Sequence, residues 1–224
     1  MGVRTMTVSG FGTVVESVGS IPATSSAAAL TTTSNVCDAD NVVINTSAGA
    51  TINFFLDVTI SNHKIAYASA NASQTSRAET RTVREHEFAH VGARNGFGSA
   101  TAIKALCDDV KVKWTAKAKT QAEVSAAITA YEDAIENYLS PMLDYFDELV
   151  VHKVQRATGI FVGMPTDADL ATVRATFEYV DPETGASRKP SNTAIATMEK
   201  SCAASAKLGE AFAKAHAAPN SVMP

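Results

Sequence analysis

His86-Glu87-Phe88-Ala89-His90 is the stretch of sequence from which the rest of the chain is interpreted. Positions four apart share one face of an α-helix, so the two histidines can offer imidazole nitrogens to a single metal ion. Glu87 stands beside them, where it can take a proton from a metal-bound water. The spacing therefore predicts a helix that binds Zn²⁺ and carries a general base.

The flanking sequence places this H-E-x-x-H pentad within a helix. Ser76 and Glu79 have the spacing of a capping box, in which each side chain bonds the other residue's amide. Residues 77–91 contain neither Pro nor Gly, and Asn95-Gly96 is typical of a helix end. The alternative is a partly buried helix whose histidines and glutamate pair with arginines one turn away.

A third metal ligand must come from elsewhere, because catalytic zinc usually takes three protein ligands. His152 is the preferred candidate. It lies near the end of a second predicted helix, with Ser140 as N-cap and Pro141 as first residue. Glu148, one turn earlier, could ligate instead or orient the His152 ring. The remaining carboxylate alternatives are Glu132 and Glu136, followed by Asp108 and Asp109.

With its two histidines and glutamate on a predicted helix, the pentad at residues 86–90 resembles the active-site helix of the zincin metallopeptidases. The chain is also loosely similar to uncharacterised bacterial proteins described as secreted zinc-dependent proteases, in which Tyr-Asp-x-x-Thr-x-His-Gly follows the H-E-x-x-H helix at long range. Asp147 and His152 keep the spacing of that signature. The departures are Phe146 between Tyr145 and Asp147, Val150 for the threonine and Lys153 for the glycine. The resemblance covers about residues 50–155 and implies a peptidase fold.

Composition limits the partners that we expect. The chain has 224 residues, 46% of them hydrophobic, which suits one main core. A net charge of -4 without a basic run predicts neither a nucleic-acid nor a membrane partner.

The sequence shows no signal peptide or transmembrane segment, which leaves a secreted mature form, the cytoplasm or a virion as locations. Three dispersed cysteines, Cys37, Cys107 and Cys202, are expected to be buried thiols.

The first fifty residues form a charge-poor segment with the alternation of β-strands. Its only charged residues are Arg4, Glu16, Asp38 and Asp40. Alternation over residues 3–8 and 13–18 predicts two strands, and residues 51–60 and 64–69 predict a further pair joined around His63. Because such strands would suit burial against a partner subunit, residues 1–50 are a candidate assembly arm.

Residues 64–69 have a second predicted role. Zincins place an edge strand above the metal helix, and peptides can bind such an edge by strand addition. This segment shortly precedes the predicted metal helix. It is therefore our candidate for the substrate-binding edge.

The remainder of the chain reads as mainly helical. Residues 100–139 predict one long helix, which Pro141 separates from the next. Residues 172–180 and the turn signal at 181–185 predict a strand or hairpin. Ser191 is expected to cap a final helix.

These observations predict an α+β fold, with a β-rich N-terminal region at 1–50 and a helix-rich, zincin-like metal-binding domain at 51–224. The predicted function is zinc-dependent hydrolysis of a peptide or protein substrate, with His86, His90 and His152 as ligands and Glu87 as base. Tyr145 is a candidate stabiliser of the oxyanion. The alternative is a structural or assembly protein, such as a virion component or homo-oligomer, whose metal site has no catalytic role.

Overall fold

The computed structural model describes residues 3–9, 11–18, 29–34, 50–54, 60–67, 83–157 and 166–216. In chain order the elements are β1 (Val3–Val8), β2 (Gly12–Val18), β3 (Ala29–Ser34), β4 (Ala50–Asn53), β5 (Ser61–Tyr67), α1 (Val83–Phe97), α2 (Ala100–Asp109), β6 (Thr115–Ala118), α3 (Gln121–Ala157), α4 (Asp167–Ala175), β7 (Tyr179–Val180), β8 (Ser187–Arg188) and α5 (Asn192–Ala215). The described part is helix-rich with small sheets, which agrees with the predicted α+β class.

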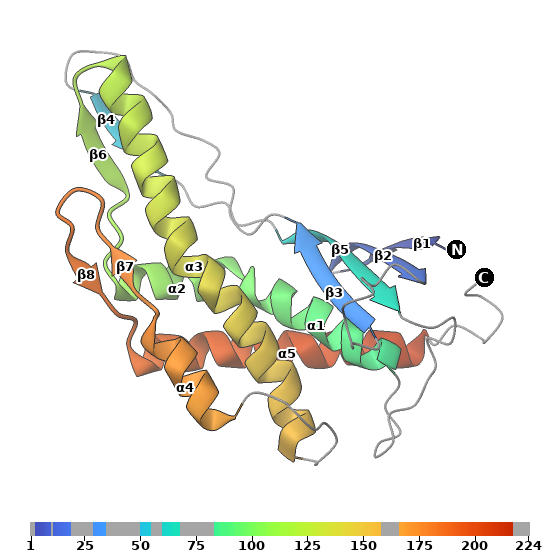
Figure 1. Ribbon diagram of the computed structural model, residues 1–224. Coiled ribbons are helices and arrows are strands. Elements are labelled where there is room, and N and C mark those ends of the chain that lie inside the picture. Colours follow the sequence, from blue (N-terminus) through green and yellow to red (C-terminus); the bar gives the residue numbers. More distant parts are fainter. Residues whose placement is uncertain are drawn as a thin grey trace.

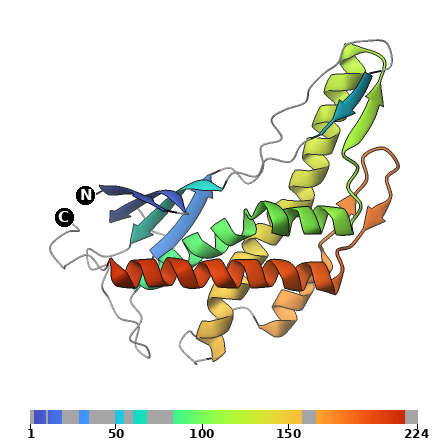
Figure 2. The ribbon, with the colours of Figure 1, turned by 180° about the vertical axis from the view of Figure 1, so that it is seen from behind.

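Helices α1 and α5 lie side by side and α3 crosses them, while the four-stranded sheet covers one end of the pair (Figure 1; Figure 2 from behind). Glycines allow α1 and α5 to approach closely. A Cβ atom built on Gly92 would overlap the Ser205 carbonyl oxygen, and one on Gly209 would overlap the Phe88 carbonyl oxygen. The two backbones are therefore in direct contact.

The predicted end of the pentad helix at Asn95-Gly96 is wrong, because α1 continues to Phe97. Gly96 serves packing, since its Cβ position would lie 2.7 Å from the Ser201 carbonyl oxygen. In return, the Ser201 hydroxyl donates a 2.7 Å hydrogen bond to the Gly96 carbonyl. The predicted start at Ser76 lies outside the described residues.

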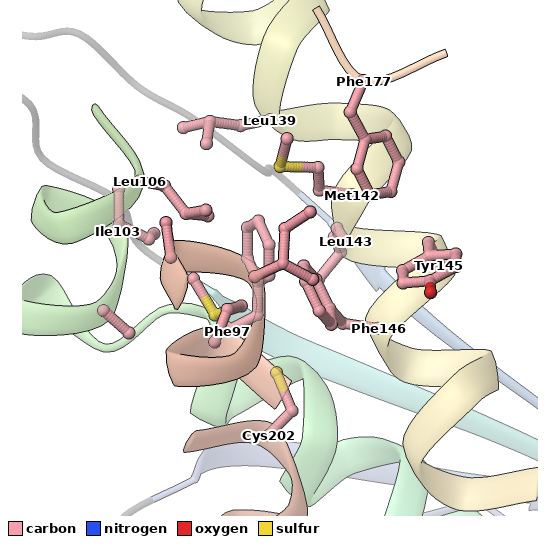
Figure 3. Packing of buried hydrophobic residues seen from close by; sticks show 14 of the residues in the cluster. Phe97, Ile103, Leu106, Leu139, Met142, Leu143, Tyr145, Phe146, Phe177 and Cys202 are labelled. Carbon is pink, nitrogen blue, oxygen red and sulfur yellow. The ribbon is translucent and has the colours of Figure 1, made fainter. Parts of the chain in front are cut away.

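Pro141 does not divide two helices, as predicted, but lies inside the continuous helix α3. Proline cannot donate the backbone hydrogen bond to the carbonyl four residues earlier, which belongs to Asn137. Both Pro141 and Asn137 are exposed, so water can satisfy that carbonyl. On the opposite side Leu139, Met142 and other residues are buried in the main core, and their packing holds the helix together (Figure 3).

The predicted single helix over residues 100–139 is also wrong. Helix α2 ends at Asp109, and Lys111 adopts a positive φ of 57° that redirects the chain. Strand β6 follows and pairs antiparallel with β4. Ile52, Ala116 and Tyr131 belong to the small core that joins this ribbon to the first half of α3.

The strands predicted at residues 3–8 and 13–18 are confirmed as β1 and β2, but the later pairing is wrong. The sheet order is β1-β2-β5-β3, with β2 and β5 parallel, whereas β4 belongs to the ribbon with β6. Strand β5 is thus an inner strand and not the predicted edge. Its Ile65 packs with Val14 of β2 and with Phe88 and Val91 of α1.

A buried ion pair ties the sheet to the helices. Arg84 Nε of α1 lies 2.9 Å from Glu16 Oε1 of β2, and both side chains are almost wholly buried. The same guanidinium donates to the carbonyl oxygen of Ala213 in α5 and covers the Phe88 ring. Strand β2 is therefore joined both to the helix that carries the pentad and to α5.

The C-terminal predictions hold in part. Residues 172–175 belong to α4 and not to a strand, because Thr166 begins a capping box with Asp169. The predicted turn does join strands β7 and β8. Ser191 caps α5 as predicted, since its hydroxyl accepts from the Ala194 amide.

Cys107 and Cys202 are buried free thiols, as expected, and Cys37 lies outside the described residues. Burial raises the pKa of the Cys202 thiol, so it stays neutral. Within the described ranges no helix has both the length and the apolar character needed to cross a bilayer.

Gly92→Ala should lower the free energy of unfolding by about 2–3 kcal/mol, because the new methyl group meets backbone that cannot move aside. Gly98→Ala is the control: its methyl group would meet only the Ile60 side chain at 3.2 Å, which can shift. Chemical denaturation of both variants measures the difference. Equal stability of the two would contradict the close packing of α1 and α5.

Candidate metal centre

The structure brings together the three histidines proposed as ligands. His86 and His90 lie one turn apart on α1, and His152 comes from α3, which packs across α1 (Figure 1). One ligand atom from each residue lies within 4.8 Å of the other two. The His152 ring stacks on His86 at 5.3 Å between centroids and meets the His90 ring edge-on at 5.0 Å.

The spacing of the first two histidines fits tetrahedral zinc. Nε2 of His86 lies 3.3 Å from Nε2 of His90. In a tetrahedral site with zinc–nitrogen bonds of about 2.0–2.1 Å, two ligand nitrogens lie about 3.3–3.4 Å apart. Three imidazoles without a thiolate are also the donor set of several catalytic zinc sites. The residues present therefore fit the metal predicted from the sequence.

Asp147 fixes the orientation of His90. Its Oδ1 lies 2.8 Å from His90 Nδ1, and its Oδ2 accepts a 2.7 Å hydrogen bond from Arg94 Nε. Because Asp147 is ionised beside Arg94, we assign the proton to His90 Nδ1, which leaves Nε2 directed at His86. Carboxylates commonly hold metal-binding histidines in this way.

The electrostatics of this pair follow from its burial. Burial alone would lower the pKa of His90, but the charge and hydrogen bond of Asp147 outweigh it and raise the pKa to about 9. Burial would likewise raise the pKa of Asp147, yet His90 and Arg94 hold it below its ordinary value. The pair is therefore charged at neutral pH in the metal-free protein.

Glu148 stands next to Asp147 in sequence and contacts the third histidine. Its Oε2 lies 2.7 Å from His152 Nδ1, one turn along α3. Burial tends to raise the pKa of Glu148, but the interaction with His152 outweighs it and the pKa is lowered. Adjacent carboxylates on α3 thus lie against one histidine from each helix: Asp147 through a hydrogen bond to His90, and Glu148 through a close contact with His152.

Glu87, the predicted base, lies beside the histidines and is 4% exposed. Its Oε1 is 3.9 Å from His86 Nε2. It is also close enough for its charge to raise the pKa of His90. A carboxylate in this position can exchange protons with a molecule held among the three rings.

Two further residues near the site were not predicted from the sequence to be part of a metal centre. His63 on β5 is fully buried, and its pKa is lowered to about 4 by burial and by the charge of Arg94. Arg94 was considered only as a partner for the pentad, but it pairs with Asp147. The only feature of the sequence that indicated Asp147 was its spacing from His152. No feature indicated His63, because the sequence predicted that the strand after it pairs with residues 51–60, whereas β5 pairs with β2 and β3.

The other candidates lie apart from this site. Among the described residues, the clusters of metal-ligand side chains do not include Glu132, Glu136, Asp108 or Asp109. Tyr145 packs against Phe146 and Phe177 at centroid distances of 5.2 and 5.0 Å. Its place in this aromatic core gives no support to a role as oxyanion donor.

His152→Ala and His86→Ala should each abolish the binding of about one zinc per chain, because two remaining histidines are too few for a stable site. Elemental analysis of the purified proteins measures this. His216→Ala is the matched control, since His216 is exposed at the end of α5. Full zinc content in His152→Ala would transfer the third-ligand role to Glu148.

Asp147→Ala should lower the free energy of unfolding by about 3 kcal/mol, because it leaves Arg94 and His90 buried without their counter-charge. Asp144→Ala is the control: Asp144 lies 3.6 Å from Arg94, but its side chain is 74% exposed. Denaturation with urea compares the two. If both substitutions lowered the free energy of unfolding by the same small amount, Asp147 would not stabilise the contact between α1 and α3.

No protein-family model, curated protein or solved structure matches the chain. The candidate metal centre is therefore described by its geometry alone: three histidines from two helices, which Asp147 holds together, with a glutamate beside them.

Proposed function

We propose that the chain is a zincin-like, zinc-dependent metallopeptidase that hydrolyses peptide bonds. The observation that carries the proposal is the position of His152, which comes from a separate helix yet lies within ligand distance of both histidines of the pentad. Glu87 adds the carboxylate that hydrolysis needs. The resemblance of the pentad helix to zincins supports the same assignment.

The residues of the chain would divide the work as follows. Zinc, when bound, would polarise the scissile carbonyl and acidify a water molecule. Glu87 would accept the proton of that water and pass it to the leaving amine. Asp147 would keep His90 in one tautomer and orientation through its hydrogen bond. Glu148, whose Oε2 lies 2.7 Å from His152 Nδ1, would place a negative charge beside that ring.

The second candidate is a structural or assembly protein whose zinc only stabilises the fold. Its support is the charge-poor N-terminal region noted in the sequence. A truncation that lacks residues 1–20 would not distinguish the enzyme from the assembly protein. It would remove β1, β2 and Glu16, the partner of Arg84, and so would disturb the fold in either case. The buried Glu87 favours the enzyme, since a purely structural site has no use for a general base.

Glu87→Gln should bind about one zinc per chain and lose peptide hydrolysis by at least about a hundredfold, because the amide cannot accept the proton. The measurement is cleavage of a fluorogenic peptide library by the zinc-loaded proteins. Glu85→Gln is the matched control, because Glu85 precedes the pentad on the same helix and is not among the clustered ligands.

Cleavage by the wild type and by Glu85→Gln, but not by Glu87→Gln, is the expected result. A zinc-loaded wild type that cleaves nothing in the library would favour the assembly protein. Unchanged hydrolysis in Glu87→Gln would remove Glu87 from the mechanism.

A further inference from the structure

The outer face of α5 carries three exposed lysines at a regular spacing of seven residues: Lys200, Lys207 and Lys214. Because seven residues make almost two turns of an α-helix, the three side chains lie on one face. Among the described residues, the lysines that form ion pairs are Lys104, Lys113 and Lys153, none of which belongs to α5. We call Lys200, Lys207 and Lys214 the lysine face.

Small and apolar side chains lie between these lysines. Ala204 and Ala211 are exposed on the same side of α5, and Leu208 is 64% exposed, more than any other large hydrophobic side chain of the described residues. The two carboxylates of α5, Glu199 and Glu210, are only partly exposed, and Glu199 already has an ion pair. Small residues beside the charges allow another helix to approach the lysine face closely.

Helix α3 carries the opposite charge. Its residues 121–152 include seven carboxylates and no lysine or arginine, although the net charge of the whole chain is only -4. Asp133, Glu136 and Asp144 are exposed, and we call them the acidic face. Asp144 lies 3.6 Å from Arg94, whereas the other two take part in no ion pair with a described residue. The negative charge of the chain is thus concentrated on α3.

The acidic face also offers a backbone acceptor. Pro141 cannot donate a hydrogen bond to the carbonyl oxygen of Asn137, and both residues are exposed beside the carboxylates. A lysine ammonium has three N–H donors, so it can bind a carboxylate and a carbonyl oxygen together. The proline within α3 therefore adds a second kind of acceptor for a cation.

The charges on the two helices have comparable spacings. With a rise of about 1.5 Å per residue, Lys207 and Lys214 lie about 10 Å apart along α5, and Glu136 and Asp144 lie about 12 Å apart along α3. The flexible lysine side chains can cover the difference. Two ion pairs can thus form at once between α5 of one molecule and α3 of another.

We propose that the lysine face of α5 binds the acidic face of α3 in a second copy of this chain. Helix α3 lies nearest the viewer in Figure 1, and α5 lies nearest in Figure 2, which is seen from behind. The two helices are therefore on opposite sides of the molecule. Each contact leaves one lysine face and one acidic face unused, so head-to-tail association continues beyond a dimer. The proposal depends on neither zinc nor hydrolysis.

Sedimentation velocity of the full chain, over a range of protein concentrations, tests the proposal. We expect the average mass to rise with concentration at about 0.01 M salt and to return to that of the monomer at about 1 M, where the screening length is about 3 Å. Lys207→Glu/Lys214→Glu should lower the association constant at least about tenfold, because it places like charges opposite each other.

The matched control is Lys117→Glu/Lys119→Glu, which makes the same change in net charge at two exposed lysines of β6 and the loop after it. It should associate as the wild type does. Circular dichroism of each variant should match that of the wild type, because all of the changed side chains are exposed.

A charge swap completes the test. Asp133→Lys/Glu136→Lys should be monomeric at low salt, because both of its faces then carry net positive charge. Mixed with Lys207→Glu/Lys214→Glu, in which both faces are net negative, it should recover association. A wild type that stays monomeric at low salt, a mixture that does not associate, or an equal loss of association in the control would overturn the proposal.

Discussion

The carboxylate of Asp147 joins the two helices on which the candidate metal centre depends. It accepts from Arg94 and is hydrogen-bonded to His90, both on α1, while its own helix α3 carries His152. The counter-charges on the two sides outweigh the desolvation penalty of burial, so the carboxylate is ionised. The side chain of Asp147 thereby orients a candidate ligand, His90, and joins two helices, so folding and the geometry of the site are coupled.

The surroundings of α1 explain how such a site can be rigid. Its glycine face contacts the backbone of α5, and Arg84 links it to β2, while Phe88 and Val91 pack beneath the sheet. A helix packed by α5, α3 and the sheet can shift little when a ligand binds, because packed interiors resist deformation. Side chains held in place in this way lose little conformational entropy when a ligand binds.

The sequence predicted the local features of the fold and of the site better than the long-range ones. The pentad helix, strands β1 and β2 and the Ser191 cap depend on nearby residues, and each of these elements formed. Pro141 and Gly96 were misread because tertiary packing overrides their usual helix-ending role. The pairing of β4 with β6 joins residues far apart in the chain, and no local pattern encodes it. His152 could be proposed from spacing, whereas His63 could not, because its place depends on the parallel pairing of β5 with β2, which also joins distant residues.

Zinc K-edge X-ray absorption of the purified, zinc-loaded protein tests the account most directly, because it reports the number and kind of ligands. We predict four nitrogen or oxygen neighbours at about 2.0–2.1 Å, with the multiple-scattering pattern of three imidazoles. Two or fewer imidazoles, or any sulfur neighbour, would contradict a centre built from His86, His90 and His152.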